Sequence, residues 1–216
     1  AIKAGDGDLF IAGGVENMTR GPYVMAKPSS AYGGDSKMYD STFGWRFVNP
    51  KMASLYGVDG MGVTAENLVA KYAISREDQD AFAYNSQMKA AAAQKSGRLA
   101  KEIVAVEIPQ RKKDPIVFKD DEFIKPNSSK EILAKLRPAF KKDGGSVTAG
   151  NASGLNDGAA ATLIASEDAV KKYNLKPMAR IVSSAVVGVE PRIMGIGPVK
   201  ASNKALEKAG LTMEDM

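Results

Sequence analysis

A run of basic side chains is the densest group of residues with an evident chemistry. Arg111, Lys112 and Lys113 are adjacent, and Lys119 and Lys125 follow in the same region. Several positive donors close together can hold phosphate oxygens. Carboxylates alternate with these cations and would repel a continuous phosphate track, so we expect no nucleic-acid partner. From the residues alone, a solvated loop remains the alternative.

A second candidate is the segment 144–158 (GGSVTAGNASGLNDG), which consists mainly of glycine and small polar residues. It offers main-chain N–H groups and the hydroxyl of Ser153 to a flat or threadlike ligand that approaches the backbone closely. The chain contains no Gly-Lys-Ser/Thr, and Gly195 and Gly197 precede Pro198 rather than the rest of a dinucleotide fingerprint. A tight loop at the entry of a strand is the alternative.

Two residue types are missing from all 216 positions, because the chain has no Cys and no His. Their absence excludes disulfides, thiolate nucleophiles, Cys/His zinc sites and imidazole bases on these residues. The acidic triplet 120–122 (DDE) is more typical of a solvated loop than of a metal site. We therefore expect no bound metal.

The composition is that of an ordinary globular protein, with 44% hydrophobic and 25% charged residues. The net charge of +5 is compatible with a plain solvated surface or with an anionic ligand. No apolar run approaches the roughly 18 residues of a transmembrane helix. The N-terminus lacks the charged segment followed by an apolar segment that is typical of a signal peptide. We expect a cytoplasmic protein without a membrane partner.

Hydrophobic periodicity and capping residues predict the elements that position these loops. The expected helices are 64–72, 75–96, 128–137, 166–173 and 200–209. The expected strands are 9–12, 102–108, 159–165 and 181–189. Residues 75–78 (SRED) and 128–131 (SSKE) fit capping boxes, and Pro138 would end the helix before it. Because residues 9–12 are wholly apolar, we expect that strand to be buried on both faces of a layered α/β core.

Ordered motifs along the chain resemble the thiolase family. They are residues 12–18 (AGGVENM), 64–67 (TAEN), 75–83 (SREDQDAFA), 136–140 (LRPAF), 147–160 (VTAGNASGLNDGAA) and 195–198 (GIGP). Thiolases transfer an acyl group between coenzyme A and a carbon or sulfur acceptor. The resemblance therefore implies that coenzyme A or an acyl-CoA is a substrate, rather than a permanently bound cofactor.

The resemblance also implies the fold, an α/β thiolase-like layered αβαβα core, present in part, with a large inserted α+β loop domain. Residues 1–18 would end the N-terminal half, and residues 155–216 would begin the C-terminal half. Residues 19–154 would form the loop domain for coenzyme A binding and oligomerisation. A homodimer or homotetramer assembled through residues 19–50 is expected.

The family's nucleophilic Cys falls before the first residue of this sequence, and its His and second Cys motifs fall after the last one. The chain thus resembles the middle of a thiolase, shortened by truncation, proteolysis or incomplete description. We expect no catalytic residue among the 216 and no activity from the chain by itself.

Matched position by position, the remaining residues resemble the part that recognises coenzyme A. Ser153 matches the serine that hydrogen-bonds the pantetheine, with Ala149 and Phe140 beside the same tether. Met61 and Met52 match apolar positions that line the tether or the adenine. The cations expected near the nucleotide and its phosphates are Lys125, Arg111 and Lys112.

Residues 44–50 (GWRFVNP) resemble the 3-oxoadipyl-CoA thiolases of aromatic catabolism. The other motifs are shared with acetoacetyl-CoA and fatty-acyl thiolases. Two alternatives to an acyltransferase stay open: a non-catalytic module for coenzyme A binding or assembly, and a sterol-carrier-like thiolase relative without turnover.

Overall fold

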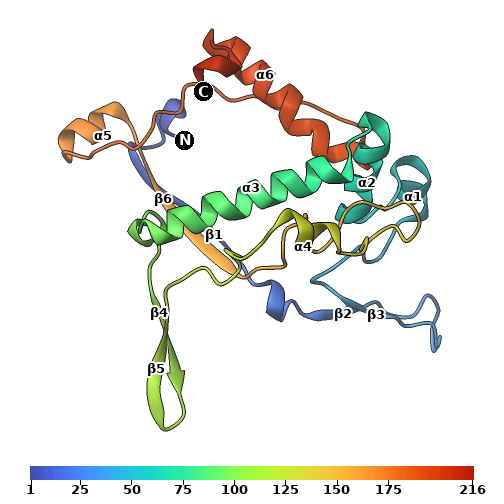
Figure 1. Ribbon diagram of the computed structural model, residues 1–216. Coiled ribbons are helices and arrows are strands. Elements are labelled where there is room, and N and C mark those ends of the chain that lie inside the picture. The colour runs from blue at the N-terminus through green and yellow to red at the C-terminus, as the bar shows by residue number, and fades with distance from the viewer. The chain divides into compact units, whose positions relative to one another are not determined.

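Strands β1 (Leu9–Glu16) and β6 (Gly158–Ala165) pair along their whole length as an antiparallel ribbon. The computed structural model, which describes residues 1–216, has them side by side (Figure 1). Gly13 is needed in β1, because a side-chain carbon there would collide with the main-chain oxygen of Ala160. Both strands were predicted, and β1 runs further than the expected 9–12.

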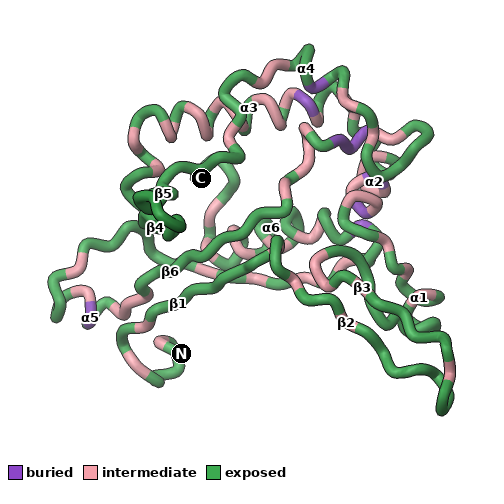
Figure 2. Tube along the Cα trace, turned by 90° about the horizontal axis from the view of Figure 1, so that it is seen from below, coloured by how far each residue is buried: buried purple, intermediate pink, exposed green.

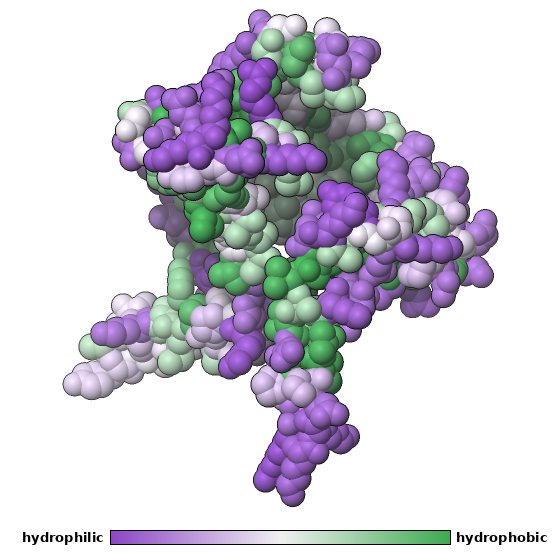
Figure 3. Space-filling model, turned by 90° about the vertical axis from the view of Figure 1, so that its left-hand side faces the viewer, coloured by the Kyte–Doolittle hydropathy of each residue, from purple (hydrophilic) through white to green (hydrophobic).

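The expected burial of the first strand is wrong. The side chains of Ile11 and Val15 are 80% and 79% exposed, and no third strand pairs with the ribbon. Because the β1–β6 ribbon has only two strands, neither strand is flanked on both edges. Its apolar side chains stay open to solvent where no other layer covers them. Apolar surface is also visible on the face drawn in Figure 3.

The chain divides into two units, which are described separately here. The first combines Ala1–Gly60 with Leu155–Met216, and the second is Met61–Gly154. Most buried residues belong to the second unit, and Figure 2 shows buried positions at α2 and α4. They are Thr64, Glu66, Asp80, Leu133, Ser146, Val147 and Thr148. The three-part division expected at residues 18 and 154 stays a prediction.

Three helices form the second unit: α2 (Met61–Tyr72), α3 (Arg76–Lys95) and α4 (Lys130–Ala134). The hydroxyl of Ser75 accepts a hydrogen bond from a main-chain N–H in the first turn of α3, and that of Ser129 does the same for α4. The cap at Ser75 was predicted, and the second cap, Ser129, lies within the capping box expected at 128–131. Each hydroxyl satisfies an N–H that has no partner within its helix.

Helix α4 ends at Ala134, earlier than expected. The guanidinium of Arg76 donates hydrogen bonds to the carbonyl oxygens of Leu133, at 2.7 Å, and Leu136, at 3.0 Å. In a longer helix these two carbonyl oxygens would accept hydrogen bonds from main-chain N–H groups further along the chain. Pro138 disfavours helical backbone at the residue before it and lacks an N–H, so the helix cannot continue towards it.

An exposed hairpin lies in the second unit after α3. Strand β4 (Val106–Gln110) pairs antiparallel with β5 (Lys113–Phe118), and every residue of both strands is exposed. The predicted strand 102–108 thus begins four residues late, after a 3₁₀ turn at Leu99–Lys101. Its partner β5 was not predicted. The hairpin projects as a separate ribbon in Figure 1.

The first unit also holds the hairpin of β2 (Tyr23–Met25) and β3 (Met38–Asp40). Its helices are α1 (Pro50–Tyr56), α5 (Glu167–Lys172) and α6 (Gly197–Ala209). Short 3₁₀ turns occupy Ile2–Ala4, Met18–Arg20, Pro191–Ile196 and Met213–Asp215. None of the helices in the chain combines the length and apolar character needed to cross a membrane.

The predicted strand at 181–189 is wrong. Its Val and Ile residues favour a strand, but no other strand lies beside it to take up its N–H and C=O groups. The segment is attached to α6 through side chains instead. The Ser183 hydroxyl donates to the carbonyl oxygen of Ala205 at 2.6 Å, and the Lys208 ammonium donates to that of Ser184 at 3.0 Å.

Candidate functional site

The carboxylate of Glu66 holds one end of the glycine-rich segment. Glu66 lies on α2 and is only 5% exposed. Its Oε1 accepts hydrogen bonds from the main-chain N–H groups of Ser146 and Val147, both at 2.8 Å. The Ser146 hydroxyl donates to Oε2 at 3.3 Å and accepts from the amide of Gln79 on α3 at 3.0 Å. These donors compensate the cost of burying the charge.

Asn151 holds the next turn of the same segment. Its Oδ1 accepts a hydrogen bond from the N–H of Thr148 at 2.7 Å. Its Nδ2 donates to the carbonyl oxygen of Ser146 and to the carboxylate of Asp80, both at 3.0 Å. Asp80 is buried on α3 and also pairs with Arg76 at 2.8 Å. Side chains of α2 and α3 therefore fix the backbone of residues 146–151.

Ala149 is an exposed residue of this fixed segment, and Ser153, two residues after it ends, is also exposed. Phe140 is held near them, because the N–H of the preceding Ala139 donates to the carbonyl oxygen of Val147 at 2.9 Å. Phe140 and Ser153 are exposed, although Ala139, next to Phe140, is hydrogen-bonded to the buried Val147. The arrangement can present an aromatic ring, a hydroxyl and small side chains to a ligand.

Met61 is joined to the same part of the second unit through its neighbour Gly62. The Phe140 ring lies so close to Gly62 that a side-chain carbon there would overlap the ring. Glycine is therefore needed at this position of α2. Met61 itself is 68% exposed. The Phe140 ring thus packs against the residue next to Met61, and both Met61 and Phe140 are accessible from solvent.

Lys125 is positioned by α3 and by its own loop. Its N–H donates to the amide oxygen of Gln87 at 2.8 Å, and its ammonium donates to the carbonyl oxygen of Glu122 at 3.1 Å. The ammonium also lies 5.9 Å from the centre of the Phe123 ring. Gln94 adds a hydrogen bond to the carbonyl oxygen of Asp121 at 3.2 Å. The loop that carries this cation is therefore ordered by side chains.

Arg111 and Lys112 lie at the tip of the β4–β5 hairpin, where both side chains are exposed. Lys112 has a φ of 63°, in the left-handed region that a tight hairpin turn requires. Neither side chain makes a hydrogen bond that would attach it to Lys125 or to Ser153. The two tip cations are thus available to an anion but are not held at the glycine-rich segment.

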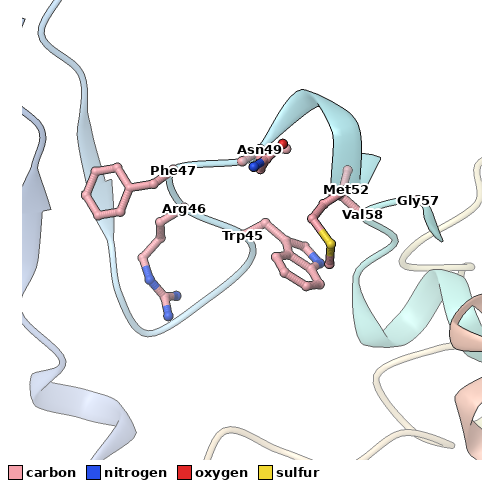
Figure 4. A pocket seen from close by; sticks show the side chains of 8 residues that line it. Trp45, Arg46, Phe47, Asn49, Met52, Gly57 and Val58 are labelled. Carbon is pink, nitrogen blue, oxygen red and sulfur yellow. The ribbon is translucent and has the colours of Figure 1, made fainter. Parts of the chain in front are cut away.

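Met52 belongs to the first unit and lines a different feature. It lies on α1, 47% exposed, beside a hollow formed by residues 45–49, 52, 57 and 58 (Figure 4). Asn49 caps α1 by accepting a hydrogen bond from the N–H of Lys51 at 2.9 Å, and Pro50 begins the helix. Seven of the eight expected coenzyme A contacts therefore belong to the second unit, and Met52 belongs to the first.

Sequence reasoning did not identify Glu66, Gln79, Asp80 and Asn151 as the residues that fix the segment. One signal was available in the sequence. Val63 lies three positions before Glu66 and Val69 lies three positions after it, so all three share the apolar face of a helix. A carboxylate at such a position must find partners when it is buried. The partners themselves, Ser146 and Val147, could not be read from the sequence.

Within the first unit, the carboxylate of Asp157 accepts two hydrogen bonds from Thr19. The N–H and the hydroxyl of Thr19 donate to this carboxylate at 3.0 and 2.6 Å. These hydrogen bonds from Thr19 favour the ionised form and lower the pKa of Asp157. The link joins the residues that follow β1 to those that precede β6.

Comparison with protein families gives two matches that together cover most of the chain. Residues 1–168 match the family described as "Thiolase, N-terminal domain", and residues 175–216 match "Thiolase, C-terminal domain". Over all 216 residues the chain is 56% identical to the beta-ketoadipyl-CoA thiolase of Acinetobacter baylyi. It is 53% identical to the 3-oxoadipyl-CoA/3-oxo-5,6-dehydrosuberyl-CoA thiolase of Escherichia coli. In both cases the chain covers 54% of the relative, so it spans about half their length.

Solved structures give the same result for the fold. Human mitochondrial 3-ketoacyl-CoA thiolase aligns with the whole chain at 43% identity and a TM-score of 0.86, and 53% of that protein is covered. A structure of human mitochondrial 3-ketoacyl-CoA thiolase in complex with CoA aligns with a TM-score of 0.84 at 42% identity, with 52% of it covered. The chain therefore has about half of the α/β fold of these proteins.

Proposed function

This chain belongs to the thiolase family, and from that premise we propose that it forms the coenzyme A-binding part of an acyltransferase. The proposed reaction moves an acyl group between coenzyme A and an acyl-CoA, by thiolytic cleavage of a 3-oxoacyl-CoA or by the reverse Claisen condensation. One observation carries the proposal. The backbone of residues 146–151 is fixed by buried side chains, while Ala149, Ser153 and Phe140 are left accessible to a ligand.

Each exposed residue has a proposed contact with one part of coenzyme A. The Ser153 hydroxyl hydrogen-bonds an amide of the pantetheine, and Ala149 leaves room for the tether to approach the backbone. Phe140 supplies apolar contact beside it, and Met61 and Met52 are proposed as apolar contacts of the tether or the adenine. The cations proposed to hold the phosphates are Lys125, Arg111 and Lys112.

For the acyl group we propose a dicarboxylic 3-oxoacyl chain of the 3-oxoadipyl type. This proposal is supported by the names of the two bacterial relatives and by the segment 44–50 (GWRFVNP). An adipyl chain ends in a carboxylate, whereas the acyl chains of acetoacetyl-CoA and of ordinary fatty acyl-CoA end in a methyl group. The difference gives the protein a charged group to recognise.

We also propose a homodimer or homotetramer assembled through residues 19–50. The β2–β3 hairpin supports the proposal, because the hairpin and its connecting loop expose several large apolar side chains. Tyr23, Met25 and Met38 are each about two-thirds exposed, and Tyr32 is fully exposed. Aromatic residues and methionine are enriched where protein surfaces meet.

A second candidate function is a non-catalytic module for coenzyme A binding or assembly. The absence of Cys and His from the 216 residues favours it, because thiolate attack and imidazole-assisted proton transfer need those side chains. The two candidates share the coenzyme A site and differ in turnover. Binding experiments on this chain therefore test what both have in common.

Replacing Ser153 by leucine is expected to weaken coenzyme A binding by about 1–3 kcal/mol. The change removes a hydrogen-bonding hydroxyl and crowds the channel proposed for the pantetheine. Isothermal titration of the 216-residue chain with coenzyme A measures the affinity. Ser36→Leu is the matched control, because Ser36 is exposed in the β2–β3 connection of the other unit. Equal affinities for the parent and Ser153→Leu would show that the segment is only structural.

The basic residues are tested by salt and by a phosphate deletion in the ligand. If Arg111, Lys112 and Lys125 hold the phosphates, raising the salt concentration weakens binding of coenzyme A, because exposed charges are screened within about 8 Å at physiological ionic strength. The affinity for dephospho-coenzyme A, which lacks the 3′-phosphate, then falls less steeply as the salt concentration rises. Each change to alanine should cost about 1 kcal/mol or less, as for other exposed ion pairs.

The control for this experiment removes three exposed cations of the first unit, Lys3, Lys27 and Lys37, so that the net charge falls equally. Affinities of both ligands are titrated at low and high salt against the parent and the two triple variants. If the alanine variant of Arg111, Lys112 and Lys125 behaves as the parent does with both ligands, these cations belong to a solvated surface.

A further inference from the structure

Two separate stretches of the second unit carry the proposed contacts with the pantetheine, and one ion pair is attached to both. The first stretch follows α4 and ends in Phe140, and the second is the segment 146–151 with the nearby Ser153. The ion pair is formed on α3, which lies beside α4 (Figure 1), by Arg76 and Asp80. Their side chains are only 22% and 6% exposed, so water has little access to the pair.

Arg76 holds the stretch that leads to Phe140. Its Nη2 donates hydrogen bonds to the carbonyl oxygens of Leu133 and Leu136, at 2.7 and 3.0 Å. These carbonyls belong to the end of α4 and to the turn that follows it. The chain then passes through Pro138, whose ring fixes its own φ. Little backbone freedom therefore separates the guanidinium of Arg76 from the aromatic ring.

Asp80 holds the other stretch through Asn151. The carboxylate uses one oxygen for each stretch: Oδ2 accepts from Nε of Arg76 at 2.8 Å, and Oδ1 accepts from Nδ2 of Asn151 at 3.0 Å. The Oδ1 atom of the same Asn151 accepts from the N–H of Thr148 at 2.7 Å. Because Asp80 is buried, loss of either partner would leave a carboxylate oxygen without a donor.

The two stretches also touch each other directly. A side-chain carbon at Gly150 would overlap the side chains of Leu133 and Leu136. The N–H of Ala139 donates to the carbonyl oxygen of Val147 at 2.9 Å. A shift of either stretch would break a hydrogen bond or open a gap beside the glycine. The ion pair and these contacts therefore set one spacing together.

We propose that Arg76 and Asp80 are positioning residues, which set the spacing between Phe140 and the segment 149–153 and so determine how tightly the pantetheine is held. Neither side chain touches the ligand, and both act through the backbone that they hold. A site that is held in place before binding loses less freedom when the ligand arrives. The inference rests on the proposed function, in which these stretches contact the pantetheine and the basic residues hold the phosphates.

The matched probes are coenzyme A and 3′-phosphoadenosine 5′-diphosphate, which is its nucleotide part without the pantetheine. Isothermal titration of the 216-residue chain gives the ratio of the dissociation constant of the nucleotide to that of coenzyme A. This ratio measures what the pantetheine adds. Contacts with the phosphates cancel in it, and the loop of Lys125 is held by Gln87 and Gln94 rather than by the ion pair.

Arg76→Gln should lower this ratio about tenfold, because a neutral amide cannot serve the carboxylate and both carbonyls. Arg76→Lys keeps the charge but lacks the planar fork, so it should lower the ratio about threefold. Asn151→Ala cuts the link to the second stretch and should also lower the ratio. Arg98→Gln is the matched control, since Arg98 pairs with Glu102 at the same i,i+4 spacing on the exposed surface of this unit, and it should leave the ratio unchanged.

Circular dichroism identifies the variants that are folded under the titration conditions. A merely structural role of the ion pair would lower stability and leave the ratio of a folded variant at the parent value. That result for Arg76→Gln or Arg76→Lys overturns the inference and leaves the proposed function standing. Unfolding of both variants, with Arg98→Gln folded, also overturns it, because the pair would then serve the fold rather than the site. A parent that binds coenzyme A no more tightly than the nucleotide contradicts the proposed pantetheine contacts themselves.

Discussion

The 216-residue chain is expected to show no measurable acyl transfer, that is, a rate at least about 10⁶-fold below that of a complete thiolase. The reason is chemical. A thiolate nucleophile and an imidazole base are both excluded, because no Cys and no His is present. Ser153 cannot replace them, since a serine hydroxyl needs an adjacent base and no side chain accepts a hydrogen bond from it in the structure.

Release of acetyl-CoA from a 3-oxoacyl-CoA and coenzyme A is the measurement, on chain whose purity is checked by intact mass. The Acinetobacter baylyi relative, assayed in parallel, shows that the substrates and conditions support turnover. Alkylation of thiols separates the chain from a contaminating thiolase, because only the contaminant has a cysteine to lose. Turnover that survives alkylation would falsify the prediction and would require a nucleophile of another type on this chain.

Replacing Glu66 by alanine is expected to destabilise the second unit by about 3–5 kcal/mol. The substitution leaves the N–H groups of Ser146 and Val147 without an acceptor, and the Ser146 hydroxyl loses one of its two partners. These groups are buried, so water does not replace the carboxylate freely. A loss of this size is a large share of the 5–15 kcal/mol that typically stabilises a domain, so the change could unfold the unit.

Urea denaturation followed by circular dichroism measures this loss. Glu66→Gln keeps an oxygen for the two N–H groups, and we expect it to cost about 1–2 kcal/mol. Glu77→Ala is the matched surface control, because Glu77 is an exposed carboxylate on α3, and its cost should stay within about 0.5 kcal/mol. Equal losses for Glu66→Ala and Glu77→Ala would mean that the buried carboxylate does not hold residues 146 and 147.

The sequence by itself determined the features that depend on neighbouring residues. Helix starts were predicted at Ser75, within 128–131 and at Ser166, and in each case a serine hydroxyl accepts a hydrogen bond from an N–H in the first turn. Gly210 was predicted to end α6, and it adopts a φ of 68° there. Such caps satisfy groups within a few residues of themselves, so the local sequence is sufficient to locate them. The family, too, was evident from the order of short motifs.

Pairing and burial were decided by the tertiary structure. Residues 181–189 have the composition of a strand and no partner, while β5 contains Pro115 and still pairs with β4. Residues 9–12 are wholly apolar, and nevertheless Leu9, Ile11 and Ala12 are exposed. A strand exists only where a second segment supplies hydrogen bonds, and burial requires a packed layer. Neither condition can be read from the segment itself.

The candidate site divides in the same way. The sequence identified which residue types could contact coenzyme A, because Ser153, Phe140 and their neighbours lie in recognisable motifs. It could not show that Glu66 and Asp80 hold the segment of Ser153 in place, since these carboxylates bind groups 71–81 positions further along the chain. A buried charge takes whichever donors the fold brings to it. The tertiary structure therefore determines which side chains hold the site in place.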